Sequence, residues 1–468
     1  MVRKILSILL LAALLVSCHP ETDVTTEYET PSTWGELFRV FWDKMSSNYI
    51  FWSLDYDHGS GWEDVYKEYN PLFNALGGIT KGGEQSKTAF QYFYEITSEL
   101  SDGHYYVDIT DGEDLFTAYP NMRRKMLSFE GYDYSEEDVF NLLDSWDGEQ
   151  FTLFFKEDED GNMAVDTDSI YYPYYQTYYE NISYILANSL GASANAPEED
   201  QRPGIPGGDA GDVETEDTDN RLFDVTYLYG TINDNYFLAV SGLSSDNIAY
   251  FGLYSFLFTA VENTTPAHQF LELYRERVSN ADGVIIDLRG NSGGYMNDLQ
   301  ILWPSFTNGH DVHFADSRRK DGDNRLDYGV WLDVTIEDEG YSFNPSVPVA
   351  VLMNGRTASS GESSVLFFKA LRDDYGFNIR FIGETTFGAF GALLSENSEE
   401  YYNAGTTSIE PYITTIYTPF CQVRYKDGTS YEGKGIEPDD EVAFDYDAFM
   451  SGTDDKLEKA LEWVRSQI

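Results

Sequence analysis

The stretch VPVAVLMNGRTASSGESSVLFFKAL, residues 347–371, contains both kinds of element on which the fold depends. Its first seven residues are almost all apolar, which predicts a buried strand. A polar turn follows at residues 354–357, and apolar residues then recur from Val365 to Leu371 as in a helix. The stretch therefore predicts strand, turn and helix, with Ser359 where the turn becomes the helix.

Ser359 has two interpretations at this position. The N–H groups of a first helical turn have no partner within the helix, so a serine there can act as a nucleophile beside a ready-made anion site. Residues 359–362, Ser-Ser-Gly-Glu, are also a capping box, in which the serine only caps the helix. Taken alone the stretch favours the cap, and a catalytic reading needs a base and an oxyanion site elsewhere in the chain.

Composition and the N-terminus restrict the class of protein. The 468 residues carry a formal charge of −51, which argues against nucleic acid or an anionic membrane surface as a partner. Arg3 and Lys4 precede an apolar run that ends in Leu-Val-Ser-Cys at residues 15–18, similar to a bacterial lipobox. We expect a signal peptide over residues 1–18, a lipid on Cys18 and a lipoprotein anchored at an outer or cell-surface membrane of the cell envelope. An ordinary signal peptide or an uncleaved anchor is the alternative.

The rest of the chain divides by its patterning. We expect a tether over residues 19–32, a helical cap over 33–103, an inserted α+β region over 104–235 that includes a disordered acidic loop (192–220), and a mixed α/β core over 236–468. In the core we predict strands at 236–240, 248–253, 283–288, 347–353, 379–383 and 413–425, and helices at 266–278, 360–372 and 454–466.

Side chains that could carry chemistry are few. His104 follows Asp102-Gly103, where a helix ends and a strand begins, so its position is fixed. His310 and His313 have H-x-x-H spacing without an obvious third ligand, and we expect no metal or cofactor. Cys421 is expected within the strand 413–425 and is discounted as a nucleophile, because no helix N-terminus lowers its pKa.

A glycine-rich loop follows the predicted strand at 283–288, in the sequence DGVIIDLRGNSGG of residues 282–294. Gly293 and Gly294 allow backbone N–H groups to point at a ligand. The loop fits a phosphate cradle, an oxyanion hole or a tight structural turn. Nucleotide binding has weak support, because neither G-x-G-x-x-G nor a P-loop lysine is present.

Four motifs in one order then resemble the C-terminal-processing (tail-specific) and tricorn-core serine peptidases. They are the glycine loop at 282–294, Asn354 with Thr-Ala-Ser-Ser-Gly-Glu at 357–362, Gly-Glu-Thr-Thr-Phe-Gly at 383–388, and Gly-Ile-Glu-Pro-Asp at 435–439. The resemblance spans about residues 236–468 and implies Ser359 as the nucleophile. It implies an oxyanion hole made by the N–H groups of Gly294 (or Gly293) and Ser360.

One departure selects the branch of that family. The tail-specific enzymes use a lysine where this chain has Ala389, so a Ser–Lys dyad cannot form at the usual place. The tricorn-like branch pairs the serine with an upstream histidine and a glutamate near the C-terminus, which implies His104 and Glu432 here. Gly103 replaces a serine of that branch, so the accessory hydroxyl of its tetrad has no counterpart at this position.

The resemblance therefore implies a lipid-anchored serine endopeptidase that cleaves peptides or unfolded proteins. The alternative is a catalytically inactive peptide- or glycan-binding lipoprotein on the same fold. Residues 108–235 occupy the place of the family's peptide-binding PDZ module, but no carboxylate-binding loop is recognisable there. Cleavage preference and oligomeric state do not follow from the sequence.

Overall fold

The computed structural model describes residues 29–123, 155–157, 163–165, 223–231, 235–261, 263–393, 405–445 and 454–468. The predicted lipobox, most of the tether and the acidic loop at 192–220 lie outside these residues. Among the helices of the described ranges, none is both long enough and apolar enough to cross a bilayer.

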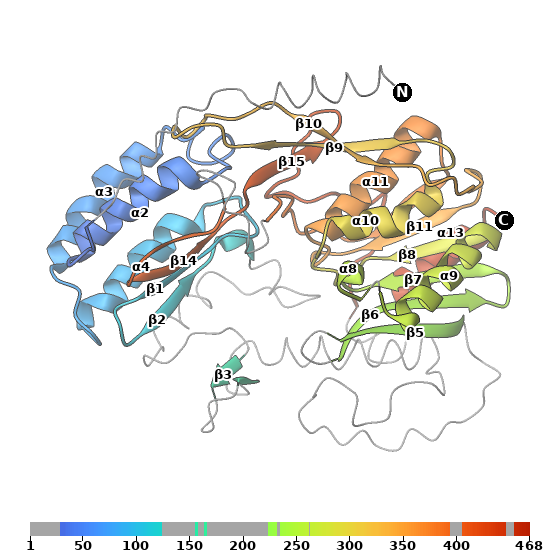
Figure 1. Cartoon of the computed structure of the whole chain (residues 1–468), viewed down its shortest axis with the longest axis horizontal. Coiled ribbons are helices and arrows are strands. Elements are labelled where there is room, and N and C mark those ends of the chain that lie inside the picture. Colours follow the sequence, from blue (N-terminus) through green and yellow to red (C-terminus); the bar gives the residue numbers. More distant parts are fainter. Residues whose placement is uncertain are drawn as a thin grey trace, which may run out of the picture. The chain divides into compact units, whose positions relative to one another are not determined.

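A seven-stranded sheet forms the centre of the α/β part (Figure 1). Its strand order is β16-β12-β11-β8-β7-β6-β5. The strands are β5 (Phe223–Thr231), β6 (Asn235–Ser244), β7 (Ile248–Leu253), β8 (Gly283–Asp287), β11 (Val349–Met353), β12 (Ile379–Gly383) and β16 (Asp440–Glu441). The five strands from β16 to β7 run parallel, and β6 and β5 extend the sheet antiparallel.

Helices cover both faces of this sheet, as the apolar strands predict. Successive residues of β11 face opposite sides of the sheet. Val351 packs in one buried cluster with α9 (Thr265–Asn280) and α11 (Ser360–Tyr375). Leu352 packs in a second buried cluster with α13 (Asp455–Arg465). The shorter elements on the first side are α8 (Phe258–Val261), α10 (Asn297–Leu302) and η4 (Trp303–Phe306). The carboxyl ends of β8 and β11 therefore lie at one edge, where their loops can meet.

Two smaller sheets correct one prediction. Residues 413–425 are not one strand but two, β14 (Ile413–Tyr417) and β15 (Cys421–Tyr425). Pro419 lies between them, and proline cannot donate a ladder hydrogen bond. β14 belongs to the sheet β13-β14-β1-β2, with β13 (Thr407–Ile409), β1 (Tyr106–Thr110) and β2 (Leu115–Ala118). β15 belongs to the sheet β10-β9-β15, with β9 (Val312–Arg319) and β10 (Leu332–Ile336).

The expected N-terminal helices are present as α2 (Trp34–Asn48), α3 (Trp62–Leu76) and α4 (Glu84–Ser98), drawn in blue in Figure 1. Their buried aromatic side chains pack against one another, for example Trp52 against Trp62. η1 (Asn121–Arg123) and the antiparallel pair β3 (Phe155–Glu157) and β4 (Met163–Val165) complete the described elements. The division of the chain into cap, insertion and core stays a prediction, and β1 pairs with β14 across that division.

Candidate active site

Ser359 lies between β11 and α11 with an unusual backbone. It is the N-cap of α11, with φ 55° and ψ −120°. A helix N-cap normally has extended torsions, and a positive φ is rare and strained in residues other than glycine. Glu362 accepts the Ser359 N–H at 3.3 Å as in the predicted capping box, but the Ser359 side chain makes no cap hydrogen bond, and capping does not require this conformation. A strained serine on a strand-to-helix turn is typical of an exposed nucleophile.

The turn is held by contacts from neighbouring segments. The Ser359 N–H donates to the carbonyl of Ala389 (3.0 Å), and the Ala358 N–H donates to the carbonyl of Asn291 (2.9 Å). The Thr357 hydroxyl donates to the carbonyl of Leu288 at the end of β8 (2.8 Å). These bonds join the turn to the glycine loop on one side and to residues 386–391 on the other, and they offset the cost of the strained torsions.

The glycine loop lies directly against the serine. A Cβ added to Gly293 would be 2.6 Å from the Ser359 Cβ and 3.1 Å from its Oγ. The Ser360 hydroxyl donates to the carbonyl of Gly294 (2.7 Å), which ties the loop to the first residue of α11. Gly293 and Gly294 have φ values of 107° and 137°, a range that L side chains rarely adopt.

The loop's N–H groups are not equivalent. The Gly293 N–H already donates to the Asn291 side-chain oxygen (2.8 Å). Within the described part of the chain, the N–H groups of Gly294 and Ser360 donate no hydrogen bond. Of the three predicted oxyanion donors, Gly294 and Ser360 therefore retain a free N–H, while Gly293 shapes the backbone beside Ser359.

His104 lies in the short segment between α4 and β1. Its N–H donates to Asp102 (2.8 Å), a fully buried carboxylate that also accepts from the Thr418 hydroxyl (2.9 Å). Gly103 lies against Ala389, because an added Cβ there would be 2.5 Å from the Ala389 Cβ. Ala389 therefore contacts both sides of the site: its side chain lies against Gly103, which precedes His104, and its carbonyl accepts from the Ser359 N–H.

Glu432 is buried beside this segment. Its Oε1 accepts from the Gly103 N–H (3.4 Å), and its Oε2 accepts from the N–H groups of Phe390 (2.8 Å) and Gly391 (3.0 Å). Burial, and next the negative charge of Asp102, raise the pKa of Glu432 well above its ordinary value. The structure therefore brings Glu432 next to the residue preceding His104, although the two are far apart in sequence.

Glu362 does more than cap a helix, which sequence reasoning missed. Its carboxylate is fully buried and accepts from the Thr386 hydroxyl (2.6 Å) and from the N–H groups of Gly388 (2.7 Å), Ala389 (2.8 Å) and Ser359 (3.3 Å). Glu362 therefore joins the turn that carries Ser359 to residues 386–389, the segment that lies against Gly103. In the sequence only the capping-box spacing pointed to Glu362. That motif accounts for the Ser359 N–H but not for the donors at Thr386, Gly388 and Ala389.

A pH-dependent stability follows from Glu362. Burial raises its pKa from 4.5 to about 7. Between those values the folded chain holds a proton that the unfolded chain has lost, so unfolding free energy falls as pH rises. We expect Glu362→Gln to remove this dependence, a difference from wild type of about 3 kcal/mol between pH 4.5 and 7.5. Urea unfolding of both proteins across that range measures it. Equal pH slopes would contradict the prediction.

The surroundings of Cys421 and Lys369 do not favour either residue as a catalytic group. Cys421 is buried at the start of β15, and burial raises the pKa of its thiol to about 11, so the thiolate is scarce at neutral pH. Lys369, on α11, pairs with Asp373 (2.8 Å) rather than reaching Ser359. Ala389 is buried where the tail-specific branch has its lysine.

Comparisons with known proteins identify a peptidase family in part of the chain. The model of Peptidase family S41 matches residues 247–442. A nisin-resistance protein of Lactococcus lactis subsp. lactis is 28% identical over 198 residues, covering 41% of this chain and 52% of that protein. The match therefore spans about half the length of this curated relative.

Two solved structures share the fold. A proposed peptidase from Parabacteroides merdae has a TM-score of 0.54 and 18% identity, over 93% of this chain and 97% of its own. Mature CPAF has a TM-score of 0.50 and 12% identity, over 92% of this chain and 96% of its own. At these identities the likeness establishes the mixed α/β architecture, which confirms the predicted fold class.

Proposed function

Residues 247–442 of this chain form a domain of Peptidase family S41, and on that premise we propose that the protein is a serine endopeptidase that works through an acyl-enzyme on Ser359. The observation that carries the proposal is the strained backbone of Ser359 beside the free N–H groups of Gly294 and Ser360. A helix cap needs neither feature.

The proposed reaction assigns one role to each of these groups. His104 accepts the Ser359 proton as the Oγ attacks the scissile carbonyl, and it returns that proton to the leaving amine. Water then hydrolyses the acyl-enzyme by the same route. The N–H groups of Gly294 and Ser360 hold the negative oxygen that develops, and one such donor contributes about 3–4 kcal/mol in serine peptidases.

Glu432 orients His104 in this proposal. An imidazolium forming nearby would lower the raised pKa of the Glu432 carboxyl, because an opposite charge favours the ionised form. The backbone donors at Gly103, Phe390 and Gly391 keep the carboxylate in place. Glu432 would thereby stabilise the charged histidine without becoming the base.

The substrate in this proposal is a peptide or an unfolded protein in the cell envelope, met by an enzyme anchored through a lipid on Cys18. The family match supports a peptide substrate. The relative named for nisin resistance supports an encounter with peptides at the cell envelope. No cofactor takes part in the proposed reaction.

A fluorophosphonate probe tests the proposal, since it reacts only with an activated serine. We expect wild type to be labelled at Ser359, identified by peptide mass, and to cleave an unstructured polypeptide such as casein. Ser359→Ala should lose both properties, and exposed-surface Ser279→Ala should keep both. Equal labelling of wild type and Ser359→Ala would overturn the proposal. Binding of the polypeptide without labelling or turnover would favour the inactive binding protein.

A further inference from the structure

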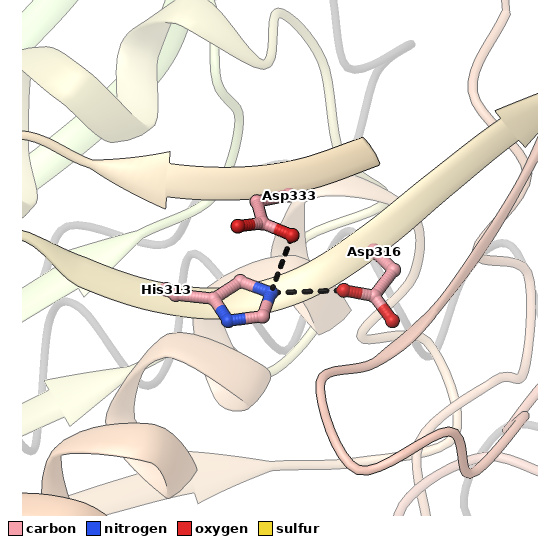
Figure 2. Close-up of side chains that lie close together, drawn as sticks. All are labelled: His313, Asp316 and Asp333. Carbon is pink, nitrogen blue, oxygen red and sulfur yellow. Dashed lines mark hydrogen bonds and ion pairs between the residues drawn. The ribbon is translucent and has the colours of Figure 1, made fainter. Parts of the chain in front are cut away.

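We propose that His313, Asp316 and Asp333 form a binding site for a divalent transition-metal ion on the sheet β10-β9-β15. Figure 2 shows one ring nitrogen of His313, Nε2, joined by dashed lines to both carboxylates. Nε2 lies 2.9 Å from Asp316 Oδ1 and 3.8 Å from Asp333 Oδ1. One donor atom from each residue lies within 4.8 Å of the other two.

A β-bulge places two of these side chains on one face. In the β9–β10 pairing Val334 lies opposite Ala315 and Thr335 opposite His313, so Phe314 is an extra residue. Without it, residues 313 and 316 would point to opposite faces, because side chains alternate along a strand. Bulges re-aim side chains in this way and are common beside functional sites. Asp333 is directly opposite Asp316 and therefore shares the same face.

The distances suit metal coordination. Zinc binds imidazole nitrogen and carboxylate oxygen at about 2.0–2.2 Å, which places neighbouring donor atoms about 3–3.5 Å apart. The observed separations of 2.9 Å and 3.8 Å bracket that range. The longer separation involves Asp333, whose side chain is 77% exposed and therefore has room to change rotamer.

Charge also favours a cation here. Like charges directly opposite each other on an antiparallel pair destabilise the pairing, and Asp316 and Asp333 are such a pair. Arg424 compensates Asp316 alone, since its Nε and second guanidinium nitrogen contact Oδ2 at 3.0 Å and 2.9 Å. Oδ1 of Asp316 stays directed at His313. The contact with Arg424 also holds the carboxylate in one orientation, as hydrogen bonds from neighbouring residues commonly do for metal ligands.

The site combines a fixed anchor with access from solvent. The side chain of Asp316 is 10% exposed, whereas that of Asp333 is 77% exposed and that of His313 36%. One nitrogen and two oxygen donors suit Zn²⁺ and Co²⁺, with water in the remaining positions. A bound ion would cross-link β9 and β10. His310, the sequence partner in H-x-x-H, instead stacks on Tyr375.

Calorimetry with Zn²⁺ and the visible absorption of Co²⁺ test the proposal on the full chain after chelator treatment. We expect one equivalent to bind, and His313→Ala and Asp333→Asn to raise the Kd at least ten-fold. Asp333 is exposed, and its substitution removes one of the two opposed charges, so the thermal midpoint of Asp333→Asn without metal should not fall below that of wild type. His310→Ala is the matched control and should bind as wild type does.

Two results would overturn the proposal. One is the absence of saturable binding by wild type, and the other is equal affinity in wild type and Asp333→Asn. A Zn²⁺-dependent rise in thermal midpoint that is lost in both ligand variants would support the cross-link between β9 and β10. These readouts do not involve peptide hydrolysis, so they are independent of the proposed activity.

Discussion

Replacing Ser359 or His104 with alanine is expected to lower kcat for peptide-bond hydrolysis by at least about 10⁴-fold. In the proposed mechanism Ser359 supplies the attacking oxygen, and without a base its hydroxyl would be too weakly acidic to react at neutral pH. A Ser–Lys dyad at the usual place is absent, because Ala389 stands at that position, and Lys369 on α11 is paired with Asp373. Initial rates on a fluorogenic peptide, with thermal midpoints to verify folding, measure the effect.

The double variant gives the sharper test. Groups that act as one catalytic unit show strongly non-additive losses. Ser359→Ala with His104→Ala should therefore be no slower than the slower single variant. His58→Ala is a suitable control, since His58 is exposed between α2 and α3 and its ring contacts the nearby carbonyl of Ser53. A His104→Ala variant that keeps kcat within ten-fold of wild type would remove His104 from the mechanism.

Gly293→Ala is expected to lower kcat/KM by about 10²–10³-fold, comparable to the loss of an oxyanion donor. The new Cβ would lie 2.6 Å from the Ser359 Cβ and 3.1 Å from the Ser360 N, so the serine or its helix start must move. Displacement of the nucleophile by about 1 Å is enough for a loss of this size. The rate of fluorophosphonate labelling should fall in parallel.

The control for Gly293→Ala separates obstruction from backbone strain. Gly77 also has a positive φ, 76°, but a Cβ there would meet no atom within 4 Å. Gly77→Ala should therefore carry the cost of the strained torsion, about 1–2 kcal/mol of stability, without a change in kcat/KM. Equal activity in the two glycine variants would show that the space beside Ser359 is not needed for catalysis.

Local patterning was sufficient for much of the architecture. The predicted strands at 248–253 and 379–383 match β7 and β12, and the helix predicted at 360–372 matches α11 except at its end. Buried parallel strands and their helices have strong apolar periodicity, so short segments identify them. The strand predicted over 413–425 was wrong, because its apolar pattern continues across Pro419 while its two halves join different sheets.

The sequence by itself determined that Ser359 opens a helix after a buried strand, and that a glycine-rich loop follows another strand of the same sheet. Only the tertiary structure decided the positive φ of Ser359, the four donors on Glu362, the position of Glu432 against Gly103, and the bulge that joins His313 to Asp316 and Asp333. The reason is physical: periodicity reports which side of an element is buried, whereas these features depend on contacts between segments far apart in the chain.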